Sequence, residues 1–182
     1  MAIMKIRLLA ACLLAAPALA GVPETVEPAQ IPAYRLIRPD LATAGQPSAE
    51  ALGRLKNLGF RTVVNLRTEM EGPADEKKSV EAQGLRYVSV PITLETFSLA
   101  DVEAVEKVLD DPSAGPVLLH CASSNRVGGV WAVIQARKGK GLDEALAAGR
   151  EAGLHSPQME AAVRRVLGMP AATPPNPAPV NP

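Results

Sequence analysis

Hydrophobic and polar positions between residues 34 and 168 follow two alternating patterns. Short runs of β-branched and apolar residues predict strands, and longer stretches with apolar side chains three or four positions apart predict helices. The repeated order of strand and helix predicts an α/β fold with a mostly parallel central sheet flanked by helices. The predicted strands are 34–37, 61–66, 86–92 and 116–120, and the predicted helices are 48–59, 74–84, 98–111, 126–139, 142–153 and 156–168.

Two local features inside the predicted helices have structural interpretations. Ser98 and Asp101 have the spacing of a capping box, so Asp101 is interpreted as the carboxylate that closes a helix start. Gly128 and Gly129 lie in the first turns of the helix 126–139. We interpret both glycines as positions where another element packs closely against the helix.

The N-terminal end of the chain resembles a targeting segment. Residues 1–20 combine Lys5 and Arg7 with an apolar run, and residues 18–20 form a small-residue cleavage site. The segment therefore predicts a signal peptide, and the mature protein is expected to be exported, either periplasmic or secreted. No membrane association is expected after cleavage.

Proline marks both borders of the predicted domain. Residues 21–33 contain three prolines and no apolar period, which predicts an extended lead-in. Residues 169–182 contain six prolines and predict a disordered or polyproline tail. The folded domain is therefore expected at residues 34–168.

The composition of the chain argues against some classes of partner for this domain. The chain has 19 basic and 19 acidic residues and 3% aromatic residues, so nucleic acid is not an expected partner. Two histidines and the one cysteine retained after signal cleavage are too few and too scattered for a metal centre, and no cofactor is predicted. Removal of the signal peptide would leave Cys121 as the single thiol.

The segment 117–134 places Cys121 between an apolar strand and an apolar helix. Ligand sites in parallel α/β folds lie beyond the carboxyl ends of the strands. Backbone N–H groups of such a loop, together with a helix N-terminus, favour an anion and stabilise a thiolate. The planar guanidinium of Arg126 can donate hydrogen bonds to two oxygens of an oxyanion. These features predict a nucleophilic Cys121, against the alternative of a buried structural cysteine.

Other polar residues near this loop have open or structural interpretations. His120 either orients the loop and assists thiolate formation or is an ordinary strand-end residue. Asn65 and Arg67 flank the end of the strand 61–66, where Arg67 is expected to be solvated. Gln46 is expected to make a turn, and His155 is expected at the surface.

The sequence "HCASSNR" after an apolar strand resembles the His-Cys…Arg signature of cysteine-dependent protein tyrosine and dual-specificity phosphatases. Those enzymes have five residues between the cysteine and the arginine, whereas four separate Cys121 from Arg126. The shorter spacing resembles a bacterial phosphatase-like family that is also found fused to β-lactamase-like hydrolases. The resemblance extends over most of residues 35–168.

The resemblance implies a phosphatase-like fold with Cys121 as nucleophile and Arg126 as the oxyanion clamp. It also implies that the residues around them bind the substrate, mainly through loop amides: His120, Ala122, Ser123, Ser124 and Asn125. Phosphatases of this type place an Asp on the loop after the preceding strand to protonate the leaving oxygen, and this chain has no Asp there. In this chain that loop, 91–98, contains one carboxylate, Glu95, which is either the general acid or a solvated loop residue.

The function expected from these features is hydrolysis of phosphomonoesters through a phosphocysteine intermediate, with a phosphorylated protein or small molecule as substrate. Two alternatives stay open. Cys121 could carry a persulfide in a sulfurtransferase, because the shorter loop makes a smaller cradle. The domain could also be a non-catalytic module that binds an anion or a partner. The sequence defines neither the substrate nor the oligomeric state.

Overall fold

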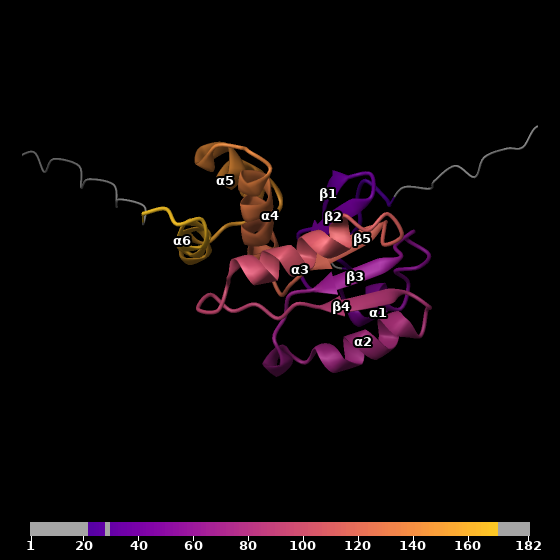
Figure 1. Cartoon of the computed structure of the whole chain (residues 1–182). Helices are drawn as coiled ribbons and strands as arrows, with labels where there is room; N and C mark the ends of the chain where they lie inside the picture. Colours follow the sequence, from indigo (N-terminus) through magenta and orange to yellow (C-terminus); the bar gives the residue numbers. More distant parts are fainter. Residues whose placement is uncertain (1–21, 28–29, 171–182) are drawn as a thin grey trace, which may run out of the picture.

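The computed structural model describes residues 22–27 and 30–170, and Figure 1 shows strands packed between helices. The predicted signal peptide and residues 171–182 of the predicted Pro-rich tail lie outside the described residues. The strands are β1 (Arg35–Arg38), β2 (Leu41–Ala44), β3 (Thr62–Asn65), β4 (Arg86–Ser89) and β5 (Val117–His120). The helices are α1 (Ala49–Leu52), α2 (Pro73–Glu81), α3 (Leu99–Leu109), α4 (Asn125–Arg137), α5 (Leu142–Glu151) and α6 (Pro157–Val166), with a short 3-10 helix η1 (Glu69–Glu71).

The strands form one mixed sheet in the order β1-β2-β5-β3-β4. β1 pairs with β2 in antiparallel fashion, and the pairs β2–β5, β3–β5 and β3–β4 are parallel. The register places Ala44, His120, Asn65 and Ser89 in one row at the carboxyl ends of the parallel strands. The segments that follow these four residues therefore emerge at the same edge of the sheet. The α/β class with a mostly parallel sheet is confirmed.

The structure differs from the prediction at one strand that was missed and one helix that is shorter. β2 was not predicted as a strand, because Leu41–Ala44 contains two alanines, which have low strand propensity, and no alternation of apolar and polar residues. Its four residues are all buried, so burial between β1 and β5 stabilises it rather than propensity. The predicted helix 48–59 ends at Leu52, because Gly53 forms the C-cap and residues 53–59 continue as turns.

Helices cover both faces of the sheet and enclose two cores (Figure 1). On one face α1 and α2 pack over apolar side chains that include Val63 and Leu118. On the other face α3, α4, α5 and α6 pack over a larger core that includes Val64 and Leu119. Successive strand residues face opposite sides, so neighbouring residues of β3 and β5 enter different cores. The same alternation directs the side chains of His120 and Cys121 to opposite sides of the sheet.

α4 lies at the centre of the larger core and is buried from Val127 to Ile134. A Cβ atom on Gly128 would lie 1.9 Å from the Leu154 nitrogen, and one on Gly129 would lie 2.3 Å from Met159 Cε. The interpretation of both glycines as close-packing positions is confirmed. The contacts bring the segment between α5 and α6 against the first turns of α4.

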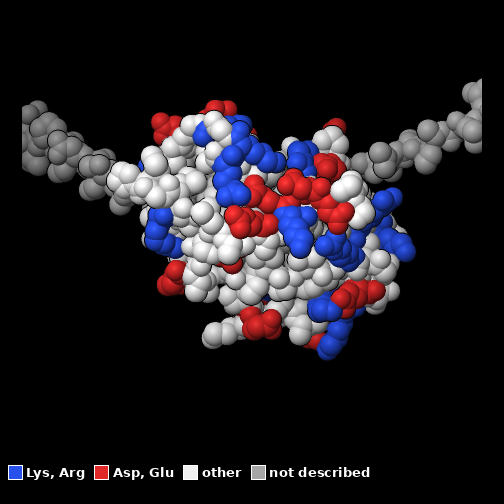
Figure 2. Space-filling view, in the orientation of Figure 1, with Lys and Arg blue, Asp and Glu red and all other residues white. Residues whose placement is uncertain are grey.

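Charged side chains of both signs are interspersed on the face shown in Figure 2. Ion pairs at the surface of the protein include Arg137 Nε with Glu106 Oε2 at 3.0 Å and Arg86 Nη1 with Asp111 Oδ2 at 2.8 Å. Such partly exposed pairs contribute little to stability, about 0–1 kcal/mol each. Within residues 22–27 and 30–170, no helix is long and apolar enough to cross a membrane, and no group of three His, Cys, Asp or Glu side chains is placed to hold a metal ion.

Candidate active site

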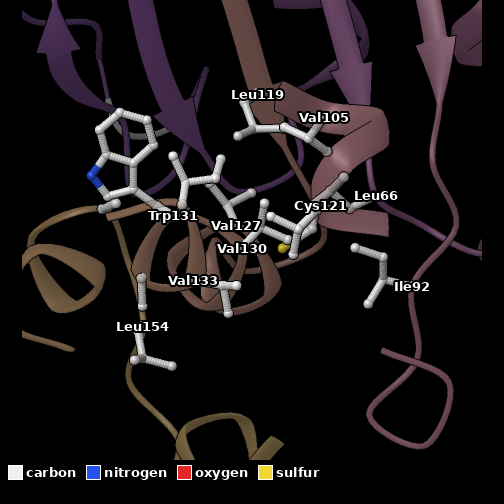
Figure 3. Packing of buried hydrophobic residues seen from close by; sticks show 14 of the residues in the cluster. Leu66, Ile92, Val105, Leu119, Cys121, Val127, Val130, Trp131, Val133 and Leu154 are labelled. Carbon is white, nitrogen blue, oxygen red and sulfur yellow. The ribbon is translucent and has the colours of Figure 1, made fainter. Parts of the chain in front are cut away.

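Cys121 directly follows β5 at the sheet edge where the parallel strands end. Its backbone N–H donates to the Ala44 carbonyl of β2 at 3.4 Å. The side chain is fully buried and belongs to the same cluster as Leu66, Val127 and Val130 (Figure 3). The groups at this edge that can stabilise negative charge are the loop amides, the N-terminus of α4 and Arg126.

The loop after Cys121 is anchored on the side of α5 and α6. Ser124 has a positive φ of 70°, and its buried hydroxyl donates to the Ala152 carbonyl at 3.0 Å. The Asn125 amide donates to Ser156 Oγ at 2.8 Å, and its oxygen accepts from the His155 N–H at 2.9 Å. The side chains of Ser124 and Asn125 are therefore used within the protein. The predicted contribution of Ser124 and Asn125 to ligand binding would therefore have to come from their main-chain amides, and it stays a prediction, as it does for Ala122 and Ser123.

The turn after β2 contacts the other side of the loop that follows Cys121. Gly45 forms an isolated antiparallel bridge with Ser123, and the Gln46 N–H donates to the Ala122 carbonyl at 3.0 Å. A Cβ atom on Gly45 would lie 3.1 Å from that carbonyl oxygen and 3.2 Å from the Pro32 oxygen. A side chain at position 45 would therefore fit only tightly between this turn and the Cys121 loop.

Arg126, in the first turn of α4, is held by Glu71. Nη1 donates to Glu71 Oε2 at 2.7 Å and Nη2 to Oε1 at 2.6 Å. Nη1 also contacts the carbonyls of Leu66 at 3.3 Å and Ile92 at 3.1 Å. Among the described residues these contacts occupy the outer end of the guanidinium, and they leave the edge formed by Nε–H and the second Nη2 hydrogen. That edge has the geometry to donate to two oxygens of an oxyanion.

Glu71 is a site residue that the sequence analysis did not identify. Its Oε2 accepts from the Thr68 N–H at 2.8 Å and from Thr68 Oγ1 at 3.0 Å, so it closes a capping box around η1. The hydrogen bond from Arg126 lowers the pKa of Glu71 to about 2 against the opposing effect of burial, and Thr68 adds to the shift. The same hydrogen bond raises the pKa of Arg126, opposed by burial and assisted by the charge of Cys121. The Thr-x-x-Glu spacing was the available sequence signal.

A second carboxylate, Glu76 of α2, is 4% exposed and lies where the strands end. Its Oε1 accepts from His120 Nε2 at 2.7 Å and from Asn65 Nδ2 at 3.1 Å. Its Oε2 accepts from Gln46 Nε2 at 2.9 Å and from Arg67 Nη1 at 3.2 Å. Burial acts to raise the pKa of Glu76, but the hydrogen bond and charge of His120, with Gln46 and Arg67, outweigh it and lower the pKa.

This network corrects two interpretations from the sequence. Arg67 was expected to be solvated, but its side chain is 13% exposed and paired with Glu76, because a buried carboxylate needs nearby donors. Gln46 does more than make a turn, since its side-chain oxygen accepts from Arg67 Nη1 at 2.6 Å while its amide donates to Glu76. His155 is exposed, as predicted.

Glu95, the predicted candidate acid, is exposed in the turn after β4. A backbone hydrogen bond within Glu95 and the Thr93 hydroxyl lower the pKa of its carboxyl group. The turn contributes to the wall of an open pocket of about 430 Å³ beside Arg126. The pocket is lined by Thr68, Met70, Glu71, Ile92, Thr93, Leu94, Ser123, Asn125 and Arg126. Glu95 would be a carboxylate at neutral pH, and its role as an acid stays a prediction.

The sheet, the Cys121 loop and the arginine in the first turn of α4 define a phosphatase-like class of protein. The structure is similar to TpbA of P. aeruginosa, with a TM-score of 0.62 and 23% identity, covering 82% of this chain and 96% of that one. It is also similar to the core catalytic domain of a PP-IP phosphatase of S. cerevisiae, with a TM-score of 0.60 and 15% identity, covering 72% and 83% of the two chains. At these identities the likeness shows the fold.

The family is shown by the sequence match. Residues 33–138 match the family described as beta-lactamase hydrolase-like protein, phosphatase-like domain, and this chain belongs to that family. Curated beta-lactamase hydrolase-like proteins of Xylella fastidiosa and Agrobacterium fabrum are 29% identical over 105 residues. The match covers 55% of this chain and 24% of those proteins, so it spans about a quarter of their length. The resemblance stated from the sequence is confirmed.

Proposed function

We propose that the protein hydrolyses phosphomonoesters and that Cys121 is the nucleophile. The observation that carries the proposal is the placement of Arg126 beside the Cys121 loop, with its outer end bound to Glu71 and its Nε edge left for an oxyanion. An anion at the N-terminus of α4 would be stabilised by the loop amides and by the helix dipole. The phosphatase-like family of the chain supports the same reaction class.

In the proposed reaction the Cys121 thiolate attacks phosphorus as the bond between phosphorus and the leaving oxygen breaks. The leaving oxygen takes that electron pair and a proton, and a phosphocysteine remains. Water then attacks the phosphocysteine and loses a proton, the sulfur–phosphorus bond breaks, and phosphate leaves with the thiolate restored. Throughout both steps Arg126 and the loop amides would stabilise negative charge on the phosphoryl oxygens.

We propose Glu95 as the acid that protonates the leaving oxygen. Because its pKa is lowered, only a small fraction of Glu95 is protonated at neutral pH. A general acid matters most for a leaving group that is a strong base. Glu95→Gln should therefore slow the hydrolysis of an alkyl phosphate more than that of a nitrophenyl phosphate. Equal rates for the variant and the wild type on both substrates would exclude Glu95 as the acid.

An aryl phosphate is the first substrate to test, because TpbA has been crystallised in complex with pTyr. Steady-state phosphate release should be measured for the wild type, Cys121→Ser and Arg126→Lys. The first variant removes the nucleophile and the second keeps the charge of Arg126 but removes its fork, so both should lose turnover. Phosphate release that survives Cys121→Ser would contradict the nucleophile assignment.

The same samples should be assayed with thiosulfate and cyanide. Turnover of thiosulfate without phosphate release would favour the sulfurtransferase alternative, and turnover of neither would favour a non-catalytic binding module. We further propose that the protein acts outside the cytoplasm, on the basis of the signal-like residues 1–20. Fractionation of cells that express the full chain would test this, and retention of the uncleaved chain in the cytoplasm would contradict it.

A further inference from the structure

The turn after β2, residues 45–47, is joined to the loop that follows Cys121 by a main-chain hydrogen bond. The Gln46 N–H donates to the Ala122 carbonyl at 3.0 Å. A peptide group is planar and trans, so its C=O and its N–H point in opposite directions. Because the Ala122 carbonyl is directed at Gln46, the N–H of the same peptide group, which belongs to Ser123, points away from the turn.

The pairing of Gly45 with Ser123 gives the same direction. These two residues form an isolated antiparallel bridge, and the hydrogen bond at the bridge joins their neighbours Gln46 and Ala122. Opposite residues in a pair of this kind exchange no hydrogen bonds with one another, so their own N–H and C=O groups point outward. Among the residues that the structure describes, the Ser123 N–H donates to no backbone acceptor. This donor is therefore available to a ligand.

The order of the strands shows what lies in that direction. β2 and β3 flank β5 on opposite sides, so the turn after β2 and the segments after β3 and β4 approach the loop from opposite sides. Arg126 is directed toward the second side, because its guanidinium contacts the carbonyls of Leu66 and Ile92. Ser123 lines the same pocket as Arg126. The Ser123 N–H therefore points to the side of the loop where Arg126 can donate to an oxyanion.

The side chain of Gln46 holds the turn in this position. Its Oε1 accepts from Arg67 Nη1 at 2.6 Å, and its Nε2 donates to Glu76 Oε2 at 2.9 Å. Arg67 and Glu76 also pair with one another at 3.2 Å, and their side chains are 13% and 2% exposed. Both polar atoms of the Gln46 amide are thus bound by charged groups that are shielded from water, which strengthens the two hydrogen bonds.

We propose that Gln46 is a positioning residue of the anion site and that it directs the Ser123 N–H at a phosphoryl oxygen of the ligand. The charged pair of Arg67 and Glu76 holds the Gln46 side chain, and the Gln46 N–H fixes the peptide group that carries the Ser123 donor. The inference rests on the proposed function, because it assumes that the loop after the nucleophile binds a phosphate group. Gln46 thus contributes to ligand binding without touching the ligand.

Gln46→Met tests the hydrogen bonds of the side chain, because methionine has a similar length and no amide group. The start of the turn stays tied by the Gly45 N–H, which donates to the Pro32 carbonyl at 2.7 Å. The peptide group that carries the Ser123 donor should then be less well oriented. The Kd of the full chain for inorganic phosphate should rise by roughly three- to tenfold, the effect of weakening one hydrogen bond to the anion. An unchanged Kd would overturn the proposal.

The amide proton of Ser123 provides a readout that a general loss of stability would not move. In NMR spectra of the isotopically labelled full chain, we expect inorganic phosphate to shift this proton downfield, since the N–H gains a charged acceptor. The shift at saturating phosphate should be clearly smaller in Gln46→Met. Equal shifts in the two proteins would overturn the proposal, and so would a wild-type Ser123 amide that does not respond to phosphate.

Gln46→Glu covers the case in which Gln46→Met does not fold. It keeps the contact with Arg67 and replaces the donor to Glu76 with a second carboxylate, so the turn should again lose its fixed position. The phosphate-induced shift of the Ser123 amide should be smaller than in the wild type. A shift of the full wild-type size would contradict the role of the Gln46 side chain.

Two control variants separate this role from other effects. Gln83→Ala removes a glutamine that also uses both amide atoms, since Nε2 donates to the Ser79 carbonyl at 2.9 Å and Oε1 accepts from the Lys56 N–H at 3.2 Å. It should leave phosphate binding unchanged, and a loss equal to that of Gln46→Met would point to a general loss of structure and overturn the proposal.

Asn65→Ala removes a different donor of the Glu76 carboxylate, at 3.1 Å, and leaves the Gln46 side chain in place. It should change the Ser123 signal much less than Gln46→Met does. Equal changes would show that the effect comes from the carboxylate and not from the turn, and would overturn the proposal.

None of these measurements requires turnover. If phosphate binds as described and no phosphate ester is hydrolysed, the proposed function is wrong and the positioning role of Gln46 stands. If a phosphate ester is hydrolysed and the Ser123 amide does not respond to phosphate, the proposed function stands and this inference is wrong.

Discussion

Arg126 and Glu71 show how one residue pair combines structural and chemical roles. Glu71 closes the capping box of η1 through Thr68 and also binds both Nη atoms of Arg126. The guanidinium is therefore oriented before any ligand arrives. A long side chain that is already ordered loses less conformational entropy when it binds an oxyanion.

Glu71→Gln should reduce kcat/KM for an aryl phosphate by roughly 10- to 100-fold, since a hydrogen bond between charged groups contributes about 1.5–3 kcal/mol. The expected cause is a less well oriented Arg126 and not the loss of a reacting group. Steady-state kinetics will measure the effect. Glu69→Gln is the control, because Glu69 is in the same short helix and is exposed. Equal losses in both variants would contradict a specific role of Glu71.

Met70 is 99% exposed and lines the pocket beside Arg126 together with Ile92 and Leu94. A thioether in contact with an aromatic ring contributes about 0.3–1.5 kcal/mol. Met70→Ala should therefore raise KM for an aryl phosphate by up to roughly tenfold and leave inhibition by inorganic phosphate unchanged. Met70→Leu should retain most of the binding. Met169→Ala, at a methionine that is 43% exposed, is the control, and an unchanged KM in Met70→Ala would exclude the contact.

At the scale of elements, α4 connects the Cys121 loop to α5 and α6. The approach of the backbone around Leu154 to Gly128 is possible because Gly128 has no side chain. The same region supplies the acceptor for Ser124 and the partners of Asn125. The shape of the loop therefore depends on the packing of two helices that follow it in the chain.

Gly128→Ala should destabilise the protein by about 3 kcal/mol, the upper part of the range for overpacking, because a Cβ at 1.9 Å from the Leu154 nitrogen meets backbone that cannot move locally. Denaturant unfolding will give the difference in the free energy of unfolding. Gly53→Ala is the matched control, because its nearest contact would be 3.4 Å and its φ is −70°. A Gly128→Ala protein as stable as the control would contradict the packing argument.

The elements and site residues that could be predicted are those whose sequence patterns lie next to one another in the chain. The apolar run, Cys121, the short loop and Arg126 are adjacent in the chain, so strand, loop and helix could be placed together. Glu76 could not be identified, because α2 resembles a polar surface helix and its role depends on residues from three other segments. The burial of the Arg67 side chain could not be predicted for the same reason. Its partner Glu76 is nine positions away in the sequence and becomes adjacent only in the folded structure.

At the scale of the whole molecule, the parallel register brings the polar side chains of the candidate site to one edge of the sheet. The two cores on either side are apolar, whereas Glu71 and Glu76 lie in the segment between β3 and the end of α2. Both carboxylates have a pKa below the usual value and are held by cations. The folded state therefore binds fewer protons at these groups than the unfolded chain at mildly acidic pH.

This difference in proton binding predicts how stability depends on pH. The pKa of Glu71 is about 2 in the folded state against 4.5 for the unperturbed group, so its contribution is fully present above about pH 4.5. It is lost as the pH falls from 4.5 towards 2, because the unfolded chain gains the proton first. The free energy of unfolding of the wild type should fall over this interval, and Glu71→Gln should show a shallower dependence on pH.

Denaturant unfolding at a series of pH values will test this prediction through the difference between the two proteins. That difference should be largest near neutral pH and should shrink towards zero near pH 2, since glutamine has no proton to gain and protonated Glu71 loses its ion pair with Arg126. Asp75→Asn is the control, because the Asp75 side chain is 95% exposed and its removal should leave the pH dependence of the wild type unchanged. Parallel curves for the wild type and Glu71→Gln down to pH 2 would mean that Glu71 binds its proton equally well in the folded and the unfolded state. The stabilising role of Glu71 would then be wrong.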